Sequence, residues 1–565
     1  MKKQTKRKIK YGILIFLGGF LLIASLTVYN ILGPFRSFFW NIPYLMGALG
    51  PKTYLVLLQN NNELRPTGGF ITAIAEVNTL FGFPSIEVND SYSIPNPPQR
   101  QNAPNAFEYL IGQNDPFFAG WTIRDANFSP DFSQSAKDVI ALYNQAYPDK
   151  YIHGVFSVDF AVIEKLLEIY GPIAVEDVIF DADNFFINSQ RISKDIDTHN
   201  VEQLKNRKNI LKPFANTLIK EIASSPSRYS KLFEELYRLT QQKHLLAYTS
   251  AEGLEKKFED HRLTGAMKIP EVNSDFLHVN IANIGGRKAD RYLQKNIRYR
   301  ADFSNPQQHL STLEISLEHL GSYNIQSDIY QAYVRVYVPE GSQFLGATGE
   351  TLTFTEQSSE LGFTVFSDYI RMKPGDKRVL TYTYSLPETI LPNDYRLQVI
   401  KQPGVDDQYW QIAVKQMNDS TMINGSAGLK MKIRENLASW QGELAMDEFF
   451  HVQQTADELG PIILWQKFET LSRINIRFNE LIDTTTALDK LNYHLTDLNE
   501  NHPETDTISI TSVRFEDRDL WLTVSGVTQQ PEEHYQIILS NIQDVHGNMT
   551  DPNPLTRTLV QRIDE

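Results

Sequence analysis

The N-terminal segment constrains this chain most, because it joins a basic tail to a long apolar run. Residues 1–10 carry six Lys or Arg side chains, and residues 11–32 carry none and are mostly apolar. A run of this length can cross a bilayer as a helix, and the positive-inside rule places the basic tail in the cytoplasm. We therefore expect a single-pass signal anchor in the cell membrane, with the bulk of the chain extracytoplasmic. A cleaved signal peptide is the alternative, although the apolar run is long for one.

The remainder is too long for a single hydrophobic core, so several domains are expected. Aromatic residues at 11% and hydrophobic residues at 41% indicate folded domains. After a juxtamembrane linker at 33–51, residues 52–302 mix strand-like and helix-like segments, which predicts an α/β domain. Residues 303–465 consist of strand-like runs between Pro/Gly turns and predict a β-sandwich. Residues 466–565 predict a second sandwich of immunoglobulin-like type.

Composition excludes several classes of site. The chain has no Cys, which rules out disulfides, Cys-ligated zinc and iron–sulfur clusters. Its formal net charge is −14, which disfavours a nucleic-acid partner because neutralising phosphates needs a basic surface. No GxxxxGK[ST], HExxH or GxSxG motif is present, and no two His residues stand at metal-ligand spacing.

The most unusual motif is a polar loop between two short apolar runs that are rich in β-formers. It places one cation among several amides and ends in two glycines, which let a backbone approach a ligand closely or adopt a positive φ. We interpret it as a candidate ligand-binding loop, and an Asn-rich surface loop is an equal alternative. Its candidate residues are Asn61, Asn62, Arg65, Gly68 and Gly69.

Two further clusters combine charged residues. Arg124, Asp125 and Asp131 lie just before a predicted helix at 133–147, where the carboxylates could hold Mg²⁺ with waters or cap the turns and the helix. Arg207 and Lys208 lie in a long helical region, where such a run is usually a solvated face. An Arg that faced inward there would bind phosphate in bidentate fashion.

Four long motifs resemble the bacterial family called domain of unknown function 4012. They are LQNNNELRPTGGF, WTIRDANFSPDFSQSA, YIHGVFSVDFAVIEKLLEIYGP and NIGGRKADRYL, and they follow one another in the right order from about residue 52 past residue 300. That family is uncharacterised, so the resemblance implies no activity. The last unit separately resembles bacterial immunoglobulin-like envelope domains, through residues 476–480 and 544–548.

The order of elements also resembles, more weakly, the LytR-CpsA-Psr family of single-span membrane proteins. That resemblance implies an extracellular α/β/α sandwich that moves polyprenyl-pyrophosphate-linked glycopolymers onto the cell wall. Its matching features are Arg65 in the first loop, the Val158-Asp159-Phe160 strand end, and the segment containing Arg207. Where the family has an Arg-Ser-Asp loop with a catalytic carboxylate, this chain has residues 67–70 without one. Asp90, Asp125 or Asp131 would then have to hold Mg²⁺.

Two functional hypotheses follow. In the first, a membrane-anchored envelope protein binds or transfers a polyprenyl-pyrophosphate-linked glycopolymer, with Arg65 and Arg207 converging on the pyrophosphate. In the second, the α/β domain is a degenerate scaffold, and the chain is a non-catalytic surface, adhesion or envelope-scaffold protein. The missing carboxylate favours the second hypothesis, and the cations favour the first.

Overall fold

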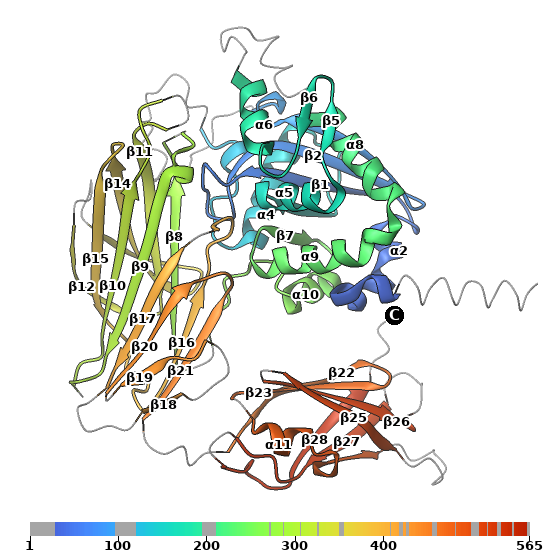
Figure 1. The fold of residues 1–565 in the computed structure, drawn as a ribbon, viewed down its shortest axis with the longest axis vertical. Coiled ribbons are helices and arrows are strands. Elements are labelled where there is room, and N and C mark those ends of the chain that lie inside the picture. The colour runs from blue at the N-terminus through green and yellow to red at the C-terminus, as the bar shows by residue number, and fades with distance from the viewer. Residues whose placement is uncertain are drawn as a thin grey trace, which may run out of the picture.

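The computed structural model describes residues 29–96, 120–194, 211–270 and 273–561. Within the last range it leaves out residues 286, 306, 325–326, 350–354, 407, 417–421, 425–428, 435, 455–459, 481, 499–507, 517, 528–532 and 545–546. Three units follow one another along the chain: an α/β domain, a large β-sandwich and a smaller C-terminal β-sandwich (Figure 1). The expectation of an α/β region followed by β-domains is confirmed.

The described chain enters the α/β domain through two short helices, η1 (Gly33–Asn41) and α2 (Ile42–Leu45). No helix among the described residues is long and apolar enough to cross a membrane. Residues 1–28, which contain most of the predicted anchor, lie outside the described part. The anchor therefore stays a prediction.

The α/β domain is built on a mixed five-stranded sheet of order β3-β2-β1-β4-β7. Only the β1–β4 pair is parallel, and the other three pairs are antiparallel. The strands are β1 (Lys52–Asn60), β2 (Phe70–Leu80), β3 (Phe83–Asp90), β4 (Gly154–Val158) and β7 (Leu245–Thr249).

Helices cover both faces of this sheet, as the alternation of side chains along β1 requires. Leu55 and Leu57 pack in one core with α4 (Phe132–Ala146), whereas Val56 and Leu58 face α5 (Phe160–Tyr170) and α8 (Leu211–Ser224). The domain is thus an α/β/α sandwich. Its other elements are η2 (Ser91–Ser93), η3 (Ile123–Asp125), β5 (Ile173–Val175), β6 (Val178–Phe180), α6 (Phe185–Lys194), η4 (Pro226–Arg228), α9 (Tyr229–Gln241) and α10 (Glu252–Asp260).

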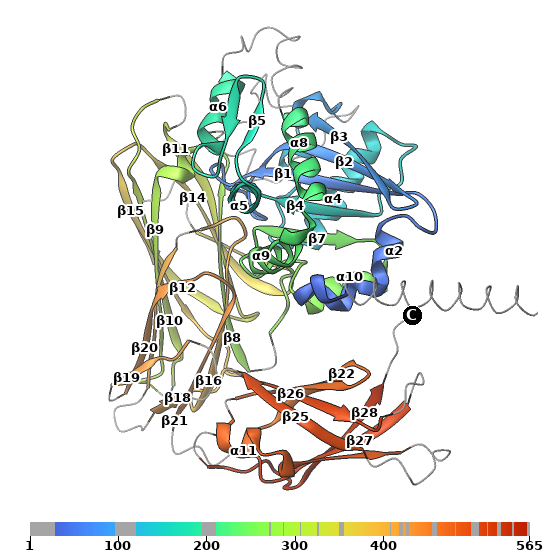
Figure 2. The same cartoon turned by 45° about the vertical axis from the view of Figure 1, so that its right-hand side comes forward.

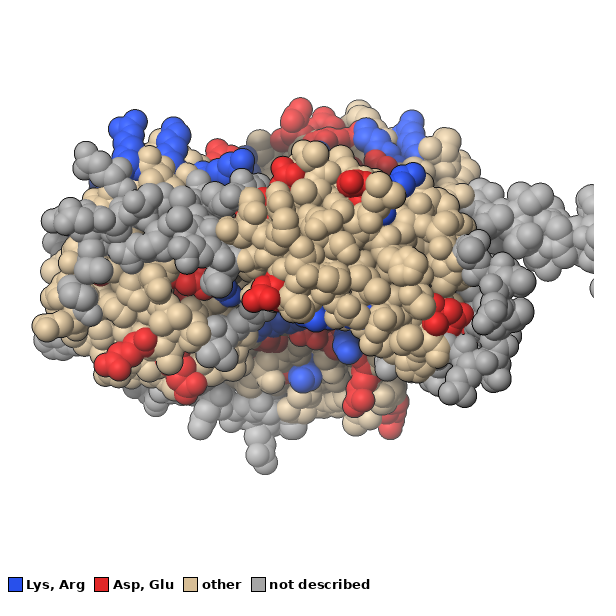
Figure 3. All heavy atoms as spheres, turned by 90° about the horizontal axis from the view of Figure 1, so that it is seen from below, with Lys and Arg blue, Asp and Glu red and all other residues tan. Residues whose placement is uncertain are grey.

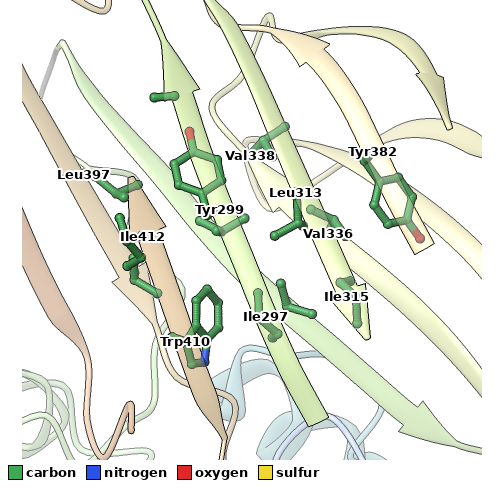
Figure 4. Packing of buried hydrophobic residues seen from close by; sticks show 14 of the residues in the cluster. Ile297, Tyr299, Leu313, Ile315, Val336, Val338, Tyr382, Leu397, Trp410 and Ile412 are labelled. Carbon is green, nitrogen blue, oxygen red and sulfur yellow. The ribbon is translucent and has the colours of Figure 1, made fainter. Parts of the chain in front are cut away.

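The large sandwich packs two seven-stranded sheets face to face. One sheet has the order β12-β15-β10-β9-β17-β20-β19 and the other β13-β14-β11-β8-β16-β21-β18. The strands are β8 (Ser274–Asn283), β9 (Leu293–Asp302), β10 (Leu310–His319), β11 (Tyr330–Val338), β12 (Gln343–Thr348), β13 (Glu356–Glu360), β14 (Phe363–Met372), β15 (Lys377–Ser385), β16 (Asp394–Ile400), β17 (Tyr409–Lys415), β18 (Met422–Asn424), β19 (Lys432–Arg434), β20 (Leu437–Glu443) and β21 (Glu448–Gln454), with η5 (Ala289–Tyr292) before β9. Figure 4 shows large side chains such as Tyr299 and Trp410 filling the space between the sheets.

The position of β8 and β9 differs from the sequence-based expectation. We expected the α/β domain to continue to residue 302, but β8 and β9 are central strands of the sandwich sheets. The sandwich therefore begins at Ser274. Sequence could not show this, because a strand's neighbours are set by pairing: β8 lies beside β11 and β16, and β9 beside β10 and β17.

One carboxylate is buried inside the sandwich. Asp275 has no exposed surface and accepts hydrogen bonds from the hydroxyl groups of Tyr299 and Tyr395 and from the backbone N–H of Phe276. Burial raises the pKa of Asp275 to about 6, although the three hydrogen bonds oppose the shift. An apolar core thus holds a carboxyl group that titrates close to neutral pH.

The C-terminal unit is a separate two-sheet sandwich with its own hydrophobic core. The sheet orders are β22-β23-β26-β25 and β24-β27-β28. Lettered A to G along the chain, this is the A-B-E-D and C-F-G arrangement of a seven-stranded immunoglobulin constant-type sandwich. The elements are β22 (Ile463–Thr470), β23 (Arg473–Phe478), α11 (Thr484–Leu488), η6 (Lys490–Asn492), β24 (Tyr493–Asp497), β25 (Ser509–Glu516), β26 (Asp519–Ser525), β27 (Glu533–Leu539) and β28 (Leu555–Gln561).

The molecule seen from below presents this unit in front. On this face, Lys and Arg side chains are interspersed with Asp and Glu and form no continuous basic surface (Figure 3). The expectation that nucleic acid is not a partner stays a prediction.

Candidate functional site

Arg65, the cation of the polar loop, is buried in the structure. Its exposed fraction is 3%, and its guanidinium group donates to Asp125 Oδ1 from Nε at 3.1 Å and from Nη2 at 3.0 Å. Nη2 also donates to Glu63 Oε1 at 3.2 Å, and Nη1 donates to the carbonyl oxygen of Asn283. Two carboxylates and a carbonyl therefore occupy the donors that an anionic ligand would need. The geometry gives Arg65 a structural role, and anion binding by it stays a prediction.

The backbone of the same loop is hydrogen-bonded to the large sandwich. Asn283 N donates to Leu64 O at 2.9 Å, and Leu64 N donates to Asp290 Oδ2 at 3.0 Å. The Nε2 atom of Gln402 donates to Arg65 O at 3.4 Å. The loop therefore adds backbone pairing between the two units, and we call residues 60–69 the docking loop.

The glycines of the docking loop permit a close backbone approach, but the neighbour is protein. A Cβ atom on Gly404 would lie 2.1 Å from Gly68 O, so position 404 has no room for a side chain. A Cβ atom on Gly68 would instead lie 2.4 Å from Gln59 Oε1. A Cβ atom on Gly69 would lie 2.4 Å from the backbone of Asn60 in the same loop. Asn61 Nδ2 completes the contact by donating to Gly404 O at 3.3 Å. Asn62 N donates to Asn60 Oδ1 at 3.1 Å and so shapes the loop from within.

The three candidate metal-binding carboxylates are dispersed, and each has a structural partner. Asp90 accepts from Tyr92 N at the start of η2, Asp131 accepts from Gln134 N at the start of α4, and Asp125 pairs with Arg65. The described residues contain no group of three or more His, Asp or Glu side chains placed to hold a metal ion. The described residues therefore do not fit a Mg²⁺ centre, and the function proposed below uses no metal ion.

Of the remaining cationic candidates, only Arg124 lies in the part of the chain that the structure describes. Arg124 lies over the Tyr92 ring, with its Cζ atom 4.7 Å from the ring centroid, and Nη1 donates to Asn96 Oδ1 at 3.4 Å. Arg207 and Lys208 fall within residues 195–210, outside the described part. The predicted convergence of Arg65 and Arg207 thus remains a prediction.

Sequence reasoning missed a second group of charged contacts between the α/β domain and the sandwich. His244 lies between two carboxylates: its Nδ1 atom is 2.6 Å from Asp159 Oδ2 and its Nε2 atom is 3.2 Å from Asp406 Oδ1. Lys401 is buried beside them and donates from Nζ to Gln242 O at 2.8 Å, and its burial lowers its pKa to about 8. No local pattern could reveal this group, because its members come from the ends of β4 and β7 and from the segment after β16.

The most ligand-like feature is an apolar cavity of about 460 Å³ inside the α/β domain. It lies between the sheet face opposite α4 and the helices α5, α6 and α8. Its walls carry aliphatic and aromatic side chains over most of their length. They include Val56, Leu58, Ala75, Val77, Ile86, Val88, Val162, Ile163, Leu166, Phe185, Phe214, Ala215, Leu218, Ile219 and Ile222.

One end of this cavity is polar. Gln59, Asn60, Glu63, Asp159 and Lys288 line it there. Gln59 and Asn60 are 2% and 0% exposed, and neither Gln59 Nε2 nor Asn60 Nδ2 has a hydrogen-bond acceptor among the described residues. Buried amide donors normally find partners, so these two N–H₂ groups are suited to oxygen atoms of a ligand. Burial also raises the pKa of Glu63, which the neighbouring Arg65 opposes.

The fold and its cavity define an α/β/α domain with a partly open apolar cavity, docked on a β-sandwich by a buried loop. Residues 49–189 match the sequence model of the family described as "Protein of unknown function (DUF4012)". The resemblance seen in the first three sequence motifs is thereby confirmed, whereas the fourth motif, at residues 283–293, lies outside the match. Comparison with curated proteins finds no significant match.

Solved structures show only remote similarity. The Lin1025 protein from Listeria innocua is 9% identical with a TM-score of 0.20, over 38% of this chain and 79% of that one. The transcriptional regulator yvhJ from Bacillus subtilis is 11% identical with a TM-score of 0.18, over 37% and 76%. The N-terminal part of the bacterial S-layer protein SbsC is 18% identical with a TM-score of 0.16, over 18% of this chain and only 24% of its own length. Similarities this low carry no argument about fold or function, and the LytR-CpsA-Psr resemblance remains an expectation.

Proposed function

We propose that this chain is a membrane-anchored, extracytoplasmic cell-envelope protein whose α/β domain binds a long-chain amphipathic lipid of the polyprenyl-pyrophosphate-linked glycan class. The cavity is the observation that carries the proposal. Its volume of about 460 Å³ falls within the range of small-molecule sites, and its walls are mostly apolar. A hydrocarbon chain is the ligand that such walls favour.

The polar end of the cavity indicates the head of the ligand. Gln59 Nε2 and Asn60 Nδ2 present two buried donors without acceptors among the described residues, and Lys288 adds a cation to the same lining. A group rich in oxygen atoms and negatively charged, such as a phosphate ester, would accept from these donors. An unsubstituted alkane would leave both donors unpaired, at a cost of about 1–3 kcal/mol each.

Binding is proposed here without group transfer. Asp90, Asp125 and Asp131 serve as caps or as the partner of Arg65. A transferase of lipid-linked glycans would need charge stabilisation at the leaving phosphate, normally by a metal ion. The arrangement of the described carboxylates favours binding without transfer, which is the binding form of the first hypothesis and shares only the absence of catalysis with the second.

The test compares two substitutions on α8. Ala215 lines the cavity, whereas Ala223 is exposed on the same helix. The full chain and its Ala215→Trp and Ala223→Trp variants would be extracted from membranes in detergent, and co-purified lipid measured by mass spectrometry. We expect Ala215→Trp to fill the cavity and lower lipid recovery about tenfold, equivalent to about 1.4 kcal/mol of binding. Ala223→Trp should match the unmodified chain.

Two results would contradict the proposal. One is an unmodified chain that carries no lipid above the level of a control membrane protein. The other is equal lipid recovery from both Trp variants, provided that circular dichroism shows both to be folded. If the recovered lipid contains no phosphate, the cavity is still the binding site, but the ligand belongs to another class of lipid.

A further inference from the structure

The end of the β2–β3 hairpin exposes large apolar side chains to solvent. Phe81 is 70% exposed, Phe83 79% and Leu80 44%, and Leu49 in the adjoining turn is 88% exposed. We call these four residues the apolar tip. Single exposed apolar residues are common on soluble proteins, but a contiguous group of them usually marks an interaction surface.

The backbone at the tip makes the presence of Phe81 more unusual. Leu80 pairs with Phe83, so Phe81 and Gly82 form a two-residue turn, and their φ angles are +49° and +88°. A turn with both φ angles positive is of type I′, which favours Asn-Gly because Asn tolerates this conformation and Phe does not. Phe81 is therefore unfavourable for the turn and gains nothing by burial. The turn conformation and the exposure to water both disfavour Phe at this position. An apolar environment outside the chain would account for its presence.

The tip is fixed to the segment that enters the domain from the N-terminus. Phe81 N donates to Gly47 O at 3.0 Å, Gly82 N donates to Met46 O at 2.9 Å, and Thr79 Oγ1 donates to Leu45 O at 3.1 Å. Figures 1 and 2 both show the end of this hairpin beside α2, at the edge of the α/β domain. The tip is thus held next to the chain that continues from the predicted anchor.

We propose that the apolar tip inserts into the surface of the lipid bilayer, at the boundary between headgroups and acyl chains. The inference rests on the membrane anchoring in the proposed function, since the anchor brings this edge of the domain to the bilayer. Lys52 lies beside the tip end of the hairpin, paired with Thr79, and its Nζ atom is 4.2 Å from the centroid of the Tyr44 ring. A cation and an aromatic ring at that level suit the headgroup region.

Insertion would also orient the cavity toward the bilayer. Val77 and Ile86 are a cross-strand pair near the tip, and both line the apolar part of the cavity. Asn60 pairs with Phe70 at the opposite end of β1 and β2, where the lining is polar. The hydrocarbon end of the cavity therefore points toward the tip and the polar end away from it. A lipid with its tail in the cavity would present its head on the side remote from the bilayer surface.

The test uses the absence of Cys from the chain. Phe81→Cys and Leu491→Cys would each be introduced into the full chain, labelled with one fluorophore, and reconstituted into phosphatidylcholine–phosphatidylglycerol vesicles that contain nitroxide-labelled lipids. Leu491 is the matched control, because it is an apolar residue 90% exposed in the C-terminal unit. We expect quenching at position 81, strongest from nitroxides about 5–10 Å below the headgroups, and none at position 491.

A second variant separates insertion from folding. Phe81→Asn restores the residue that the turn prefers, so we expect it to raise the melting temperature of the protein. In a chain labelled through Phe83→Cys, the same substitution should weaken quenching at position 83. A lowered melting temperature would show that Phe81 supports the fold and would overturn the proposal.

The outcomes distinguish the two proposals. In one outcome, the chain floats with the vesicles, but the label at position 81 is quenched no more than the label at position 491. This outcome would support the anchor and overturn insertion of the tip. A chain that fails to float with vesicles at all would overturn the anchor, and with it the insertion that depends on it.

Discussion

At the scale of single residues, Arg65 shows how a cation in a polar loop can be structural. Its guanidinium group joins Glu63 and Asp125 and also reaches the Asn283 carbonyl oxygen of the sandwich. In sequence, this Arg stands among amides with no neighbouring carboxylate except Glu63, a pattern that fits a ligand-binding loop and an Asn-rich surface loop equally well. Asp125 lies on η3 and could not be identified as its partner from sequence.

The structural role of Arg65 predicts a large loss of stability on its removal. Arg65→Ala would remove the hydrogen-bonded counter-charge of the buried Glu63 carboxylate and of Asp125, so the free energy of unfolding should fall by about 3–5 kcal/mol. Arg124→Ala, in the same region but partly exposed, should cost less than about 1 kcal/mol. Urea denaturation followed by tryptophan fluorescence measures both. Equal, small effects would refute the structural role.

Asp275 gives a pH-dependent prediction. A pKa raised from the ordinary 3.8 to about 6 means that the folded state binds the proton more tightly than the unfolded state. The stabilisation is complete below the unfolded pKa and is lost as pH rises through about 6, amounting to about 3 kcal/mol. Asp275→Asn lacks this titration. Because the loss accrues between the unfolded pKa of 3.8 and the folded pKa of about 6, the melting temperature of the unmodified protein, relative to that of the variant, should fall between pH 4 and pH 7. Parallel curves would contradict the assignment.

At the scale of elements, local patterns predicted helices and strands well and their partners poorly. The helix expected at 133–147 is α4 (Phe132–Ala146), and the strand end expected at Val158-Asp159-Phe160 is the junction of β4 and α5. Capping side chains, a Gly with φ of +94° and apolar periodicity are encoded within a few residues. The docking loop and the cavity are not so encoded. The loop needs Asn283, Gln402 and Gly404, and the cavity is space left between a sheet face and three helices.

The close approach of Gly404 to Gly68 can be tested with a matched glycine. Gly404 and Gly375 both have positive φ angles, +73° and +88°, but a Cβ atom on Gly375 would meet nothing within 4 Å. Gly375→Ala should therefore cost only the backbone strain, about 1 kcal/mol. Gly404→Ala should cost clearly more and increase hydrogen exchange in residues 61–69, as measured by mass spectrometry. Similar hydrogen exchange of residues 61–69 in both variants would show that the contact between Gly404 and Gly68 can relax without separating the docking loop from the sandwich.

At the scale of the whole molecule, the two sandwiches differ in their independence. The large sandwich shares a network of hydrogen bonds and ion pairs with the α/β domain, whereas the C-terminal unit has its own core and a complete strand order. The spacing of turns in the sequence already predicts a sandwich for this unit, because each of its strands is short and bounded by its own turn.

The C-terminal unit should therefore fold alone. Expressed as residues 461–565, it should give a β-type circular dichroism spectrum and a cooperative thermal transition. The remaining chain, without these residues, should recover as much lipid as the full chain. A fragment of residues 29–270, which ends before the sandwich, should be less stable than the same domain in the full chain because its docking loop has no partner. A helical or non-cooperative C-terminal fragment would show that its boundary is wrong.

The pairing of β8 has a consequence for the order in which the chain is completed during synthesis. β8 lies between β11 and β16, and Gly404 follows β16 directly. A nascent chain that has emerged only to residue 300 therefore has a finished set of α/β strands, an uncovered docking loop and two sandwich strands with open edges. Such edges invite pairing with other chains. β9 keeps an open edge until its second neighbour, β17 (Tyr409–Lys415), has also emerged. We therefore expect the nascent chain to be most prone to pairing with other chains between translation of residue 283 and that of residue 415, when a holding chaperone would protect it.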